Sequence, residues 1–176
     1  KERFSQAVKE TETVVYSYLP EETGHQKTIF EAMNYSVKAG GKRLRPLLMR
    51  EVYRLFGGNG PEIEPFMAAM EMIHTSSLIH DDLPCMDNDE YRRGKLTTWK
   101  AYGYDMAVLA GDALMIYAFE TASKAFSMGA DPAKVGRAIG ILAEKTGIYG
   151  MIGGQTVDVE LTGKAVPREK LDFIYR

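Results

Sequence analysis

The stretch HTSSLIHDDLPCMDNDEYRRG, residues His74–Gly94, decides how the rest of the chain is interpreted. An apolar helical pattern leads into it, and an acidic cluster near its end is followed at once by two arginines. The cluster consists of Asp81, Asp82, Asp87, Asp89 and Glu90. Carboxylates this close together repel one another, and burying one without a partner is costly. The stretch therefore predicts a bound cation.

Magnesium is the cation that this pattern favours. It is a hard ion that takes oxygens from one or two carboxylates and fills its other positions with water and substrate phosphates. Arg92 and Arg93 suit the same ligand, since a guanidinium group grips phosphate through two parallel hydrogen bonds. The plainer alternative is a solvated helix end, and metal binding by Cys85 lacks a second cysteine to support it. We interpret the stretch as a Mg²⁺–diphosphate site.

Length and composition narrow the class of protein. The chain has 176 residues, of which 45% are hydrophobic, and a formal net charge of −2. One domain over residues 1–176 with a sizeable core is expected at this length, and the charge argues against nucleic acid as the main partner. No apolar run approaches a membrane span, and the first residues are charged and unlike a signal sequence. The chain has one cysteine and so cannot form an internal disulfide, which agrees with a reducing compartment. We therefore expect a cytoplasmic location.

Helical periodicity dominates the chain and strand alternation is nearly absent, so the predicted fold class is all-α. Glycine and proline mark the helix ends: Gly40 and Gly41 stop one helix, and Pro46 suits the first turn of the next. A loop is expected over Gly94–Lys100. The expected helices cover 1–19, 28–38, about 42–56, 62 to the acidic cluster, about 104–126, 133–148, 149–162 and a last one from about 167.

Helical spacing relates the histidine of the stretch to its carboxylates. At 100° per residue, His74, Ser77 and Asp81 share one face of a helix. Asp87 would lie about 120° away from Asp81 if the helix continued, and Pro84 cannot donate a helical hydrogen bond. The helix is therefore predicted to loosen over Leu83–Asp87 and let both carboxylates reach one group of ions.

Four motifs carry a resemblance to a known family. They are GGKRLRP at 40–46, MIHTSSLIHDDLPCMDNDEYRRGK at 72–95, LAGDALM at 109–115 and GGQTVDVE at 153–160. In content and order they resemble the trans-isoprenyl diphosphate synthases of the farnesyl and geranylgeranyl type. The resemblance covers essentially the whole chain and implies an isoprenoid-synthase-type helical bundle, a homodimer and a Mg²⁺-dependent prenyltransferase. Its substrates would be isopentenyl diphosphate and an allylic diphosphate.

The resemblance also implies roles for individual residues. Asp81 and Asp87 resemble the Mg²⁺ ligands, with Asp82 as a supporting carboxylate. Arg92 resembles the arginine that binds the allylic diphosphate, so these four residues are the expected catalytic group. The expected pocket for isopentenyl diphosphate consists of Lys42, Arg45, His74 and Arg93. Gln155 and Asp158, one helical turn apart, resemble a pair that borders the allylic site.

Product length in this family depends on how far the hydrocarbon tail can run along the helix away from the metals. In the family, a bulky aromatic residue five positions before the first aspartate stops the product at farnesyl, and here that position is Ser76. With Ser77 also small, the sequence favours geranylgeranyl, unless Met33, Met72 or Phe119 fills the space. The plain alternative is that both serines bond back to helix carbonyls.

The chain also departs from the family. The family's second aspartate-rich motif does not occur before Arg176, so we expect an N-terminal portion of a longer synthase, without the last helices of the bundle. The loop Leu96-Thr97-Thr98-Trp99 also differs from the Thr-Asn-His that the family usually has there, and the sequence gives Trp99 no role. Two other functions remain open: a non-catalytic synthase-like subunit, and an HD-type metal phosphohydrolase built on His80 and Asp81. A structural helical protein with an incidental acidic loop is the third alternative.

Overall fold

The structure is a computed structural model that describes residues 2–175. The chain divides into two compact units, residues 1–130 and 131–176, and each is described by itself. The single domain expected from the sequence stays a prediction. The helices of the first unit are α1 Glu2–Ser17, α2 Lys27–Val37, α3 Leu44–Leu55, η1 Pro61–Ile63, α4 Glu64–Asp81, α5 Thr98–Tyr102, α6 Tyr104–Ser123 and η2 Lys124–Ser127.

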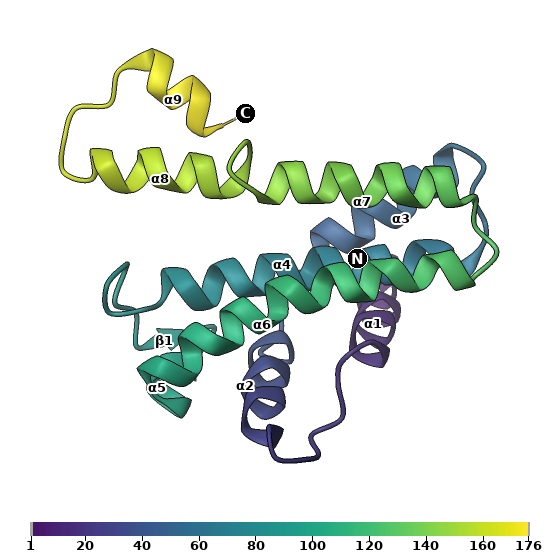
Figure 1. Ribbon diagram of the computed structural model, residues 1–176, viewed down its shortest axis with the longest axis horizontal. Coiled ribbons are helices and arrows are strands. Elements are labelled where there is room, and N and C mark those ends of the chain that lie inside the picture. The colour runs from purple at the N-terminus through teal and green to yellow at the C-terminus, as the bar shows by residue number, and fades with distance from the viewer. Residues whose placement is uncertain (1, 176) are drawn as a thin grey trace. The chain divides into compact units, whose positions relative to one another are not determined.

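The first unit is organised around α4 and α6, which run side by side in Figure 1. Eleven of the 18 residues of α4 are buried, so this helix is apolar on nearly every side. Small residues of α6 let the two helices approach closely. At Gly111 a Cβ atom would lie 2.1 Å from Nε2 of His80, which leaves room for hydrogen only. The LAGDALM motif therefore has a packing role as well as its family resemblance.

The three N-terminal helices pack around this central pair. α1 and α3 contact α4, and α2 contacts both α4 and α6. Between α2 and α3 the chain turns through Gly40 and Gly41, with φ of 91° and 146°, and Arg43 then takes φ of 49° directly before α3. A positive φ is uncommon for a residue with a side chain and costs about 1–3 kcal/mol. The burial of Arg43, described below, explains how this conformation is held.

The segment after the acidic cluster is more ordered than the predicted loop over Gly94–Lys100. Tyr91–Arg92 (β1) pairs antiparallel with Lys95–Leu96 (β2), and the short helix α5 follows. The prediction of a loop was wrong here, because tight turns and hydrogen bonds to distant residues order the segment without any apolar periodicity. The all-α class is confirmed, since this two-residue ladder is the one sheet within residues 2–175.

One segment has the length and composition that a membrane span requires, which the sequence analysis did not expect. Residues Tyr104–Ser127 have a mean hydropathy of 1.2 over their most apolar window. This segment contains α6, the partner of α4 at the centre of the first unit. The core helix of a soluble protein passes the same test, so the finding is weak evidence for a span.

The second unit contains three helices, α7 Pro132–Thr146, α8 Met151–Leu161 and α9 Arg168–Ile174. α7 begins as its sequence predicts: Pro132 occupies the first turn, and the Asp131 side chain accepts a hydrogen bond of 2.9 Å from the backbone N–H of Ala133. α8 contacts both α7 and α9. The predicted break near Gly147–Gly150 is confirmed.

Candidate active site

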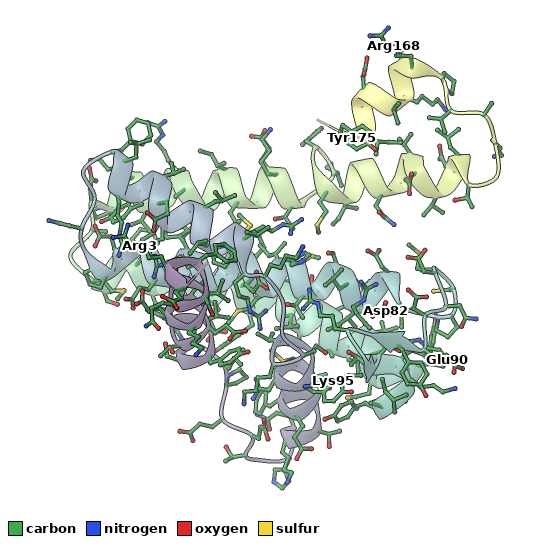
Figure 2. All side chains as sticks on the ribbon, turned by 180° about the vertical axis from the view of Figure 1, so that it is seen from behind. Arg3, Asp82, Glu90, Lys95, Arg168 and Tyr175 are labelled. Carbon is green, nitrogen blue, oxygen red and sulfur yellow. The ribbon has the colours of Figure 1, made fainter. Side chains whose placement is uncertain are left out.

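Residues 81–90, called the acidic loop, begin where α4 ends. The helix stops at Asp81, and the chain turns back so that the N–H of Asp87 donates to the carbonyl oxygen of Asp81 over 2.9 Å. The predicted interruption of the helix is therefore confirmed, and the backbones of the two aspartates lie next to each other. Figure 2 shows Asp82 and Glu90 at the same end of the first unit as Lys95.

Asp81 and Asp87 also interact electrostatically. Burial raises the pKa of Asp81 above its usual value, and the nearby charge of Asp87 raises it further, while Arg92 opposes the shift. The ionised form of Asp81 is therefore less favourable in the folded protein than in the unfolded chain, and a bound cation would offset this difference. Within residues 2–175 no three acidic, His or Cys side chains gather closely enough to hold a metal by themselves. Two carboxylates with open positions for phosphate and water fit Mg²⁺, which rarely has an all-protein shell.

The carboxylate of Asp82 forms an ion pair with Arg92. Arg92 donates through Nε to both carboxylate oxygens, at 2.9 and 3.0 Å, and through Nη2 to Oδ1 at 2.6 Å. Asp82 is only 3% exposed, so this ion pair is largely shielded from water. Its side chain therefore orients Arg92 at the acidic loop, a more specific arrangement than the general supporting carboxylate expected from the resemblance.

The turn between α2 and α3, residues 38–43, is called the glycine loop. A cavity of about 410 Å³ lies where this loop meets α4. All four residues expected to bind isopentenyl diphosphate line it, together with Glu71, two further residues of the glycine loop and the first residue of α3. The lining residues are Gly41, Lys42, Arg43, Leu44, Arg45, Glu71, His74 and Arg93. The structure thus brings together residues as far apart in the sequence as Lys42 and Arg93. A concave site with this excess of cations suits a small polyanion.

His74 is held among positive charges. Its Nε2 lies 3.4 Å from Nη1 of Arg45. Burial lowers the pKa of His74, Arg45 lowers it further, and Glu71 acts in the opposite direction. The imidazole is therefore neutral at physiological pH in the ligand-free cavity, where it can accept or donate a hydrogen bond.

Arg43 and Glu71 form a buried ion pair that the sequence analysis missed. Nη1 of Arg43 donates to Oε1 of Glu71 over 2.7 Å, and both side chains are at most 3% exposed. Arg43 also donates to Glu12, to the hydroxyl of Tyr16 and to the carbonyl of Val37. This network holds the left-handed conformation of Arg43 and thereby fixes Lys42 and Arg45 on either side of it. A glutamate within an otherwise apolar helix was the available signal.

Other predicted residues lie as follows. Ser76 is fully buried, and its hydroxyl donates to the carbonyl of Ile73, while that of Ser77 donates to the carbonyl of His74. The alternative in which both serines bond back to the helix is therefore confirmed, which leaves their effect on product length as a prediction. Gln155 and Asp158 lie on α8 in the second unit, so their place beside the acidic loop also stays a prediction.

His80 contacts α6. Its Nε2 lies 3.3 Å from the carbonyl oxygen of Val108 and 3.5 Å from Oδ1 of Asp112. An HD-type centre needs further histidine and aspartate ligands around this dipeptide, and residues 2–175 contain no such group. The packing of His80 against Gly111 accounts for its place in the motif.

Gly41 offers a test of the cavity. A Cβ there would lie 2.8 Å from Nη1 of Arg93, whose guanidinium also bonds to the carbonyl of Gly40. We expect Gly41→Ala to displace this arginine and to weaken binding of inorganic pyrophosphate without metal by about tenfold, the loss of one charge-assisted contact. Gly57→Ala is the control, because Gly57 also has a positive φ, of 83°, but nothing lies within 4 Å of its added Cβ. Equal affinities of the two variants by calorimetry would contradict the assignment.

Together, the helical fold, the cationic cavity and the acidic loop define the class of isoprenoid-synthase-type proteins. The profile of the Polyprenyl synthetase family matches residues 26–173. The chain therefore belongs to this family, whose members are prenyltransferases.

Named relatives agree with the family. The chain is 50% identical over 148 residues to "Geranylgeranyl pyrophosphate synthase, chloroplastic" of Capsicum annuum, covering 84% of the chain and 40% of that protein. It is 44% identical over 165 residues to "Farnesyl diphosphate synthase" of Geobacillus stearothermophilus, covering 94% of the chain and 55% of that protein. The chain thus spans about half the length of the curated relatives it matches.

Solved structures share the fold. An FPP/GFPP synthase from Zymomonas mobilis in its apo form matches with a TM-score of 0.86 and 40% identity, over 94% of this chain and 59% of that one. A geranyltransferase from Legionella pneumophila matches with a TM-score of 0.90 and 34% identity, over 98% of this chain and 60% of that one. The predicted isoprenoid-synthase fold is confirmed.

Proposed function

We propose that the protein is a Mg²⁺-dependent polyprenyl diphosphate synthase that joins isopentenyl diphosphate to an allylic diphosphate. One observation supports the proposal: the cationic cavity and the acidic loop lie about two turns apart along α4, with His74 lining the cavity and Asp81 at the start of the loop. Two diphosphate groups, one held by cationic side chains and one by metal, would therefore bind within a few helical turns of each other. This is the arrangement that a two-substrate condensation requires.

Each group has a part in the proposed reaction. Lys42, Arg45, His74 and Arg93 bind and orient the diphosphate of isopentenyl diphosphate. Asp81 and Asp87 hold Mg²⁺, which when bound stabilises the charge that grows on the leaving diphosphate of the allylic substrate. Arg92, oriented by Asp82, adds positive charge on the same side.

The carbon chemistry follows from that leaving group. The C–O bond of the allylic ester breaks, and the double bond of isopentenyl diphosphate supplies the electron pair for the new C–C bond. A proton then leaves, and the released diphosphate is the proposed base. Apolar residues of α4 exclude water that would otherwise capture the carbocation.

The test separates the two proposed diphosphate sites. Calorimetry with inorganic pyrophosphate is expected to give one binding event without metal and a second that appears only with Mg²⁺. Radiolabelled isopentenyl diphosphate is then incubated with dimethylallyl, geranyl or farnesyl diphosphate and Mg²⁺, and the products are sized. A chain that binds both diphosphates without turnover would favour a non-catalytic synthase-like subunit. Absence of any Mg²⁺-dependent binding would reject the metal site.

Geranylgeranyl diphosphate is the product that we propose. The support is Ser76, a small residue one turn before the acidic loop on α4. We expect Ser76→Tyr to shift the main product of the synthase toward farnesyl diphosphate, because a ring there blocks a growing tail, whereas Ser77→Ala leaves product length unchanged. Products are measured by chromatography, and an unchanged product length in Ser76→Tyr would contradict this proposal.

A cytoplasmic location and a homodimer are further proposals. The plant relatives are named chloroplastic.

A further inference from the structure

Two side chains that follow the acidic loop in the sequence, Thr97 and Trp99, form hydrogen bonds to its backbone. The carbonyl oxygen of Asp89 accepts hydrogen bonds of 2.8 Å from the Thr97 hydroxyl and of 2.8 Å from the indole Nε1 of Trp99. The backbone N–H of Thr97 donates to the carbonyl of Glu90 as well. The loop is thus tied at its far end to the start of α5.

α5 is itself anchored to α2, far away in the sequence. The hydroxyls of Ser36 and Thr98 lie 2.6 Å apart, and Tyr35 donates to the carbonyl of Leu96 over 2.8 Å. Thr97 and Thr98 are at most 4% exposed. The donors that reach Asp89 therefore project from a fixed element.

This anchoring opposes a force that acts within the loop. The backbones of Asp81 and Asp87 lie side by side, since the N–H of Asp87 is 2.9 Å from the carbonyl oxygen of Asp81, and two carboxylates of like charge this close repel each other. Before a cation binds, this repulsion favours conformations in which Asp87 moves away from the end of α4. If the loop is already held in place, less conformational entropy is lost when a cation binds, and the affinity for the cation is higher.

We propose that Trp99 is a positioning residue for the acidic loop: its indole N–H holds the Asp89 carbonyl, keeps Asp87 beside Asp81 and so raises the affinity of the loop for a divalent cation. The metal part of this proposal rests on the proposed function, whereas the effect on the loop does not. Lys100 assists, because its Nζ lies 2.6 Å from Oε1 of Glu90.

The variant Trp99→Phe keeps an aromatic ring and removes the N–H. Its first measurement needs no metal: hydrogen exchange of the Asp87 amide, which bonds to the carbonyl of Asp81. We expect protection of this amide to fall about tenfold in Trp99→Phe, the loss of one ordinary hydrogen bond. Amides inside α4 and α6 should keep their protection. Tyr102→Phe, on the same helix but packed against Tyr35, is the control and should leave Asp87 unchanged.

The second measurement is the affinity for Mg²⁺ in the presence of inorganic pyrophosphate, by calorimetry. Trp99→Phe should weaken it by about 10- to 100-fold, the range seen when a partner of a metal ligand is removed, while metal-free pyrophosphate binding stays unchanged. Trp99→His, which retains a ring N–H, should recover part of the affinity. Since Trp99 is the one tryptophan of the sequence, its fluorescence in the unaltered protein should also change as Mg²⁺ saturates the loop.

The outcomes separate the two proposals. If exchange of the Asp87 amide and Mg²⁺ affinity are both unchanged in Trp99→Phe, the positioning role is overturned. An unaltered protein that binds no Mg²⁺ but loses Asp87 protection in the variant would overturn the metal site and uphold the positioning of the loop. A loss of protection spread over α4 and α6 would mean a general structural role and would also overturn the proposal.

Discussion

Replacing Glu71 by alanine is expected to lower the free energy of unfolding by about 3–5 kcal/mol, because it leaves the guanidinium of Arg43 buried with half of its ionic partners gone. Arg43 is 2% exposed and cannot turn to water without moving the glycine loop. Its remaining acidic partner, Glu12, lies at 3.2 Å and is itself partly exposed. Urea unfolding followed by circular dichroism measures the change.

The control is Glu51→Ala. Glu51 pairs with Arg54 at 3.1 Å, where both side chains are more than half exposed. Its other partner, Arg50, lies at 3.5 Å and keeps a second acidic partner, Glu10, so at most about 1 kcal/mol should be lost. The double variant Arg43→Met/Glu71→Leu removes both charges and should be more stable than Glu71→Ala. If Glu71→Ala costs no more than Glu51→Ala, the ion pair does not hold the loop.

This prediction extends to the cavity. Lys42 and Arg45 flank Arg43, whose strained backbone depends on the ion pair with Glu71. Loss of the pair should therefore weaken metal-free binding of pyrophosphate even under conditions where the variant remains folded. Stability and affinity would then fall together, although Glu71 is itself negatively charged and would repel the ligand.

The double variant Asp81→Asn/Asp87→Asn is expected to weaken Mg²⁺ binding in the presence of pyrophosphate by at least about 100-fold. Replacing an indirect partner of a metal ligand already costs about 10- to 100-fold, and here both proposed ligands lose their charge. Calorimetry with Mg²⁺ and inorganic pyrophosphate measures the loss. Metal-free binding to the cationic cavity should persist.

The same variant should unfold no more easily than the original protein. The pKa of Asp81 is raised in the folded state by burial and by Asp87, so the folded protein holds that proton more tightly than the unfolded chain does. Ionised Asp81 at neutral pH therefore works against folding, and asparagine removes this penalty. Asp105→Asn, at the exposed start of α6, is the control and should alter neither property. Unchanged Mg²⁺ affinity in the double variant would rule out these two residues as ligands.

Much of the fold could be predicted from local patterns. Glycine and proline marked the ends of the helices within a few positions, as at Gly40–Gly41 before α3 and Asp131–Pro132 before α7. Pro84, which lacks the N–H that a continuing helix needs, predicted an interruption over Leu83–Asp87, and α4 ends two residues before that range, at Asp81. These features depend on residues close together in the chain, so periodicity and turn chemistry were sufficient.

The parts that were missed depend on contacts between distant residues. β1, β2 and α5 carry no apolar period, and they are ordered by Tyr35, Ser36 and the loop carbonyl of Asp89. The role of Trp99 could not be predicted from the sequence because its hydrogen-bond partner is a backbone carbonyl. Every residue has such a carbonyl, so no residue type indicates the contact. The resemblance to a family likewise named residues for the site without giving their mutual distances.

By itself, the sequence determined the helical class, the ends of most helices and which residues we propose for a cation and diphosphate site. Only the tertiary structure decided that Arg43 is buried and paired with Glu71, that Asp82 pairs with Arg92, and that Trp99 on α5 donates to the carbonyl of Asp89. The physical reason is that helix formation is governed by neighbours three or four residues apart. The partner of a buried charge or carbonyl is instead chosen by packing, which brings together groups that the chain order keeps apart.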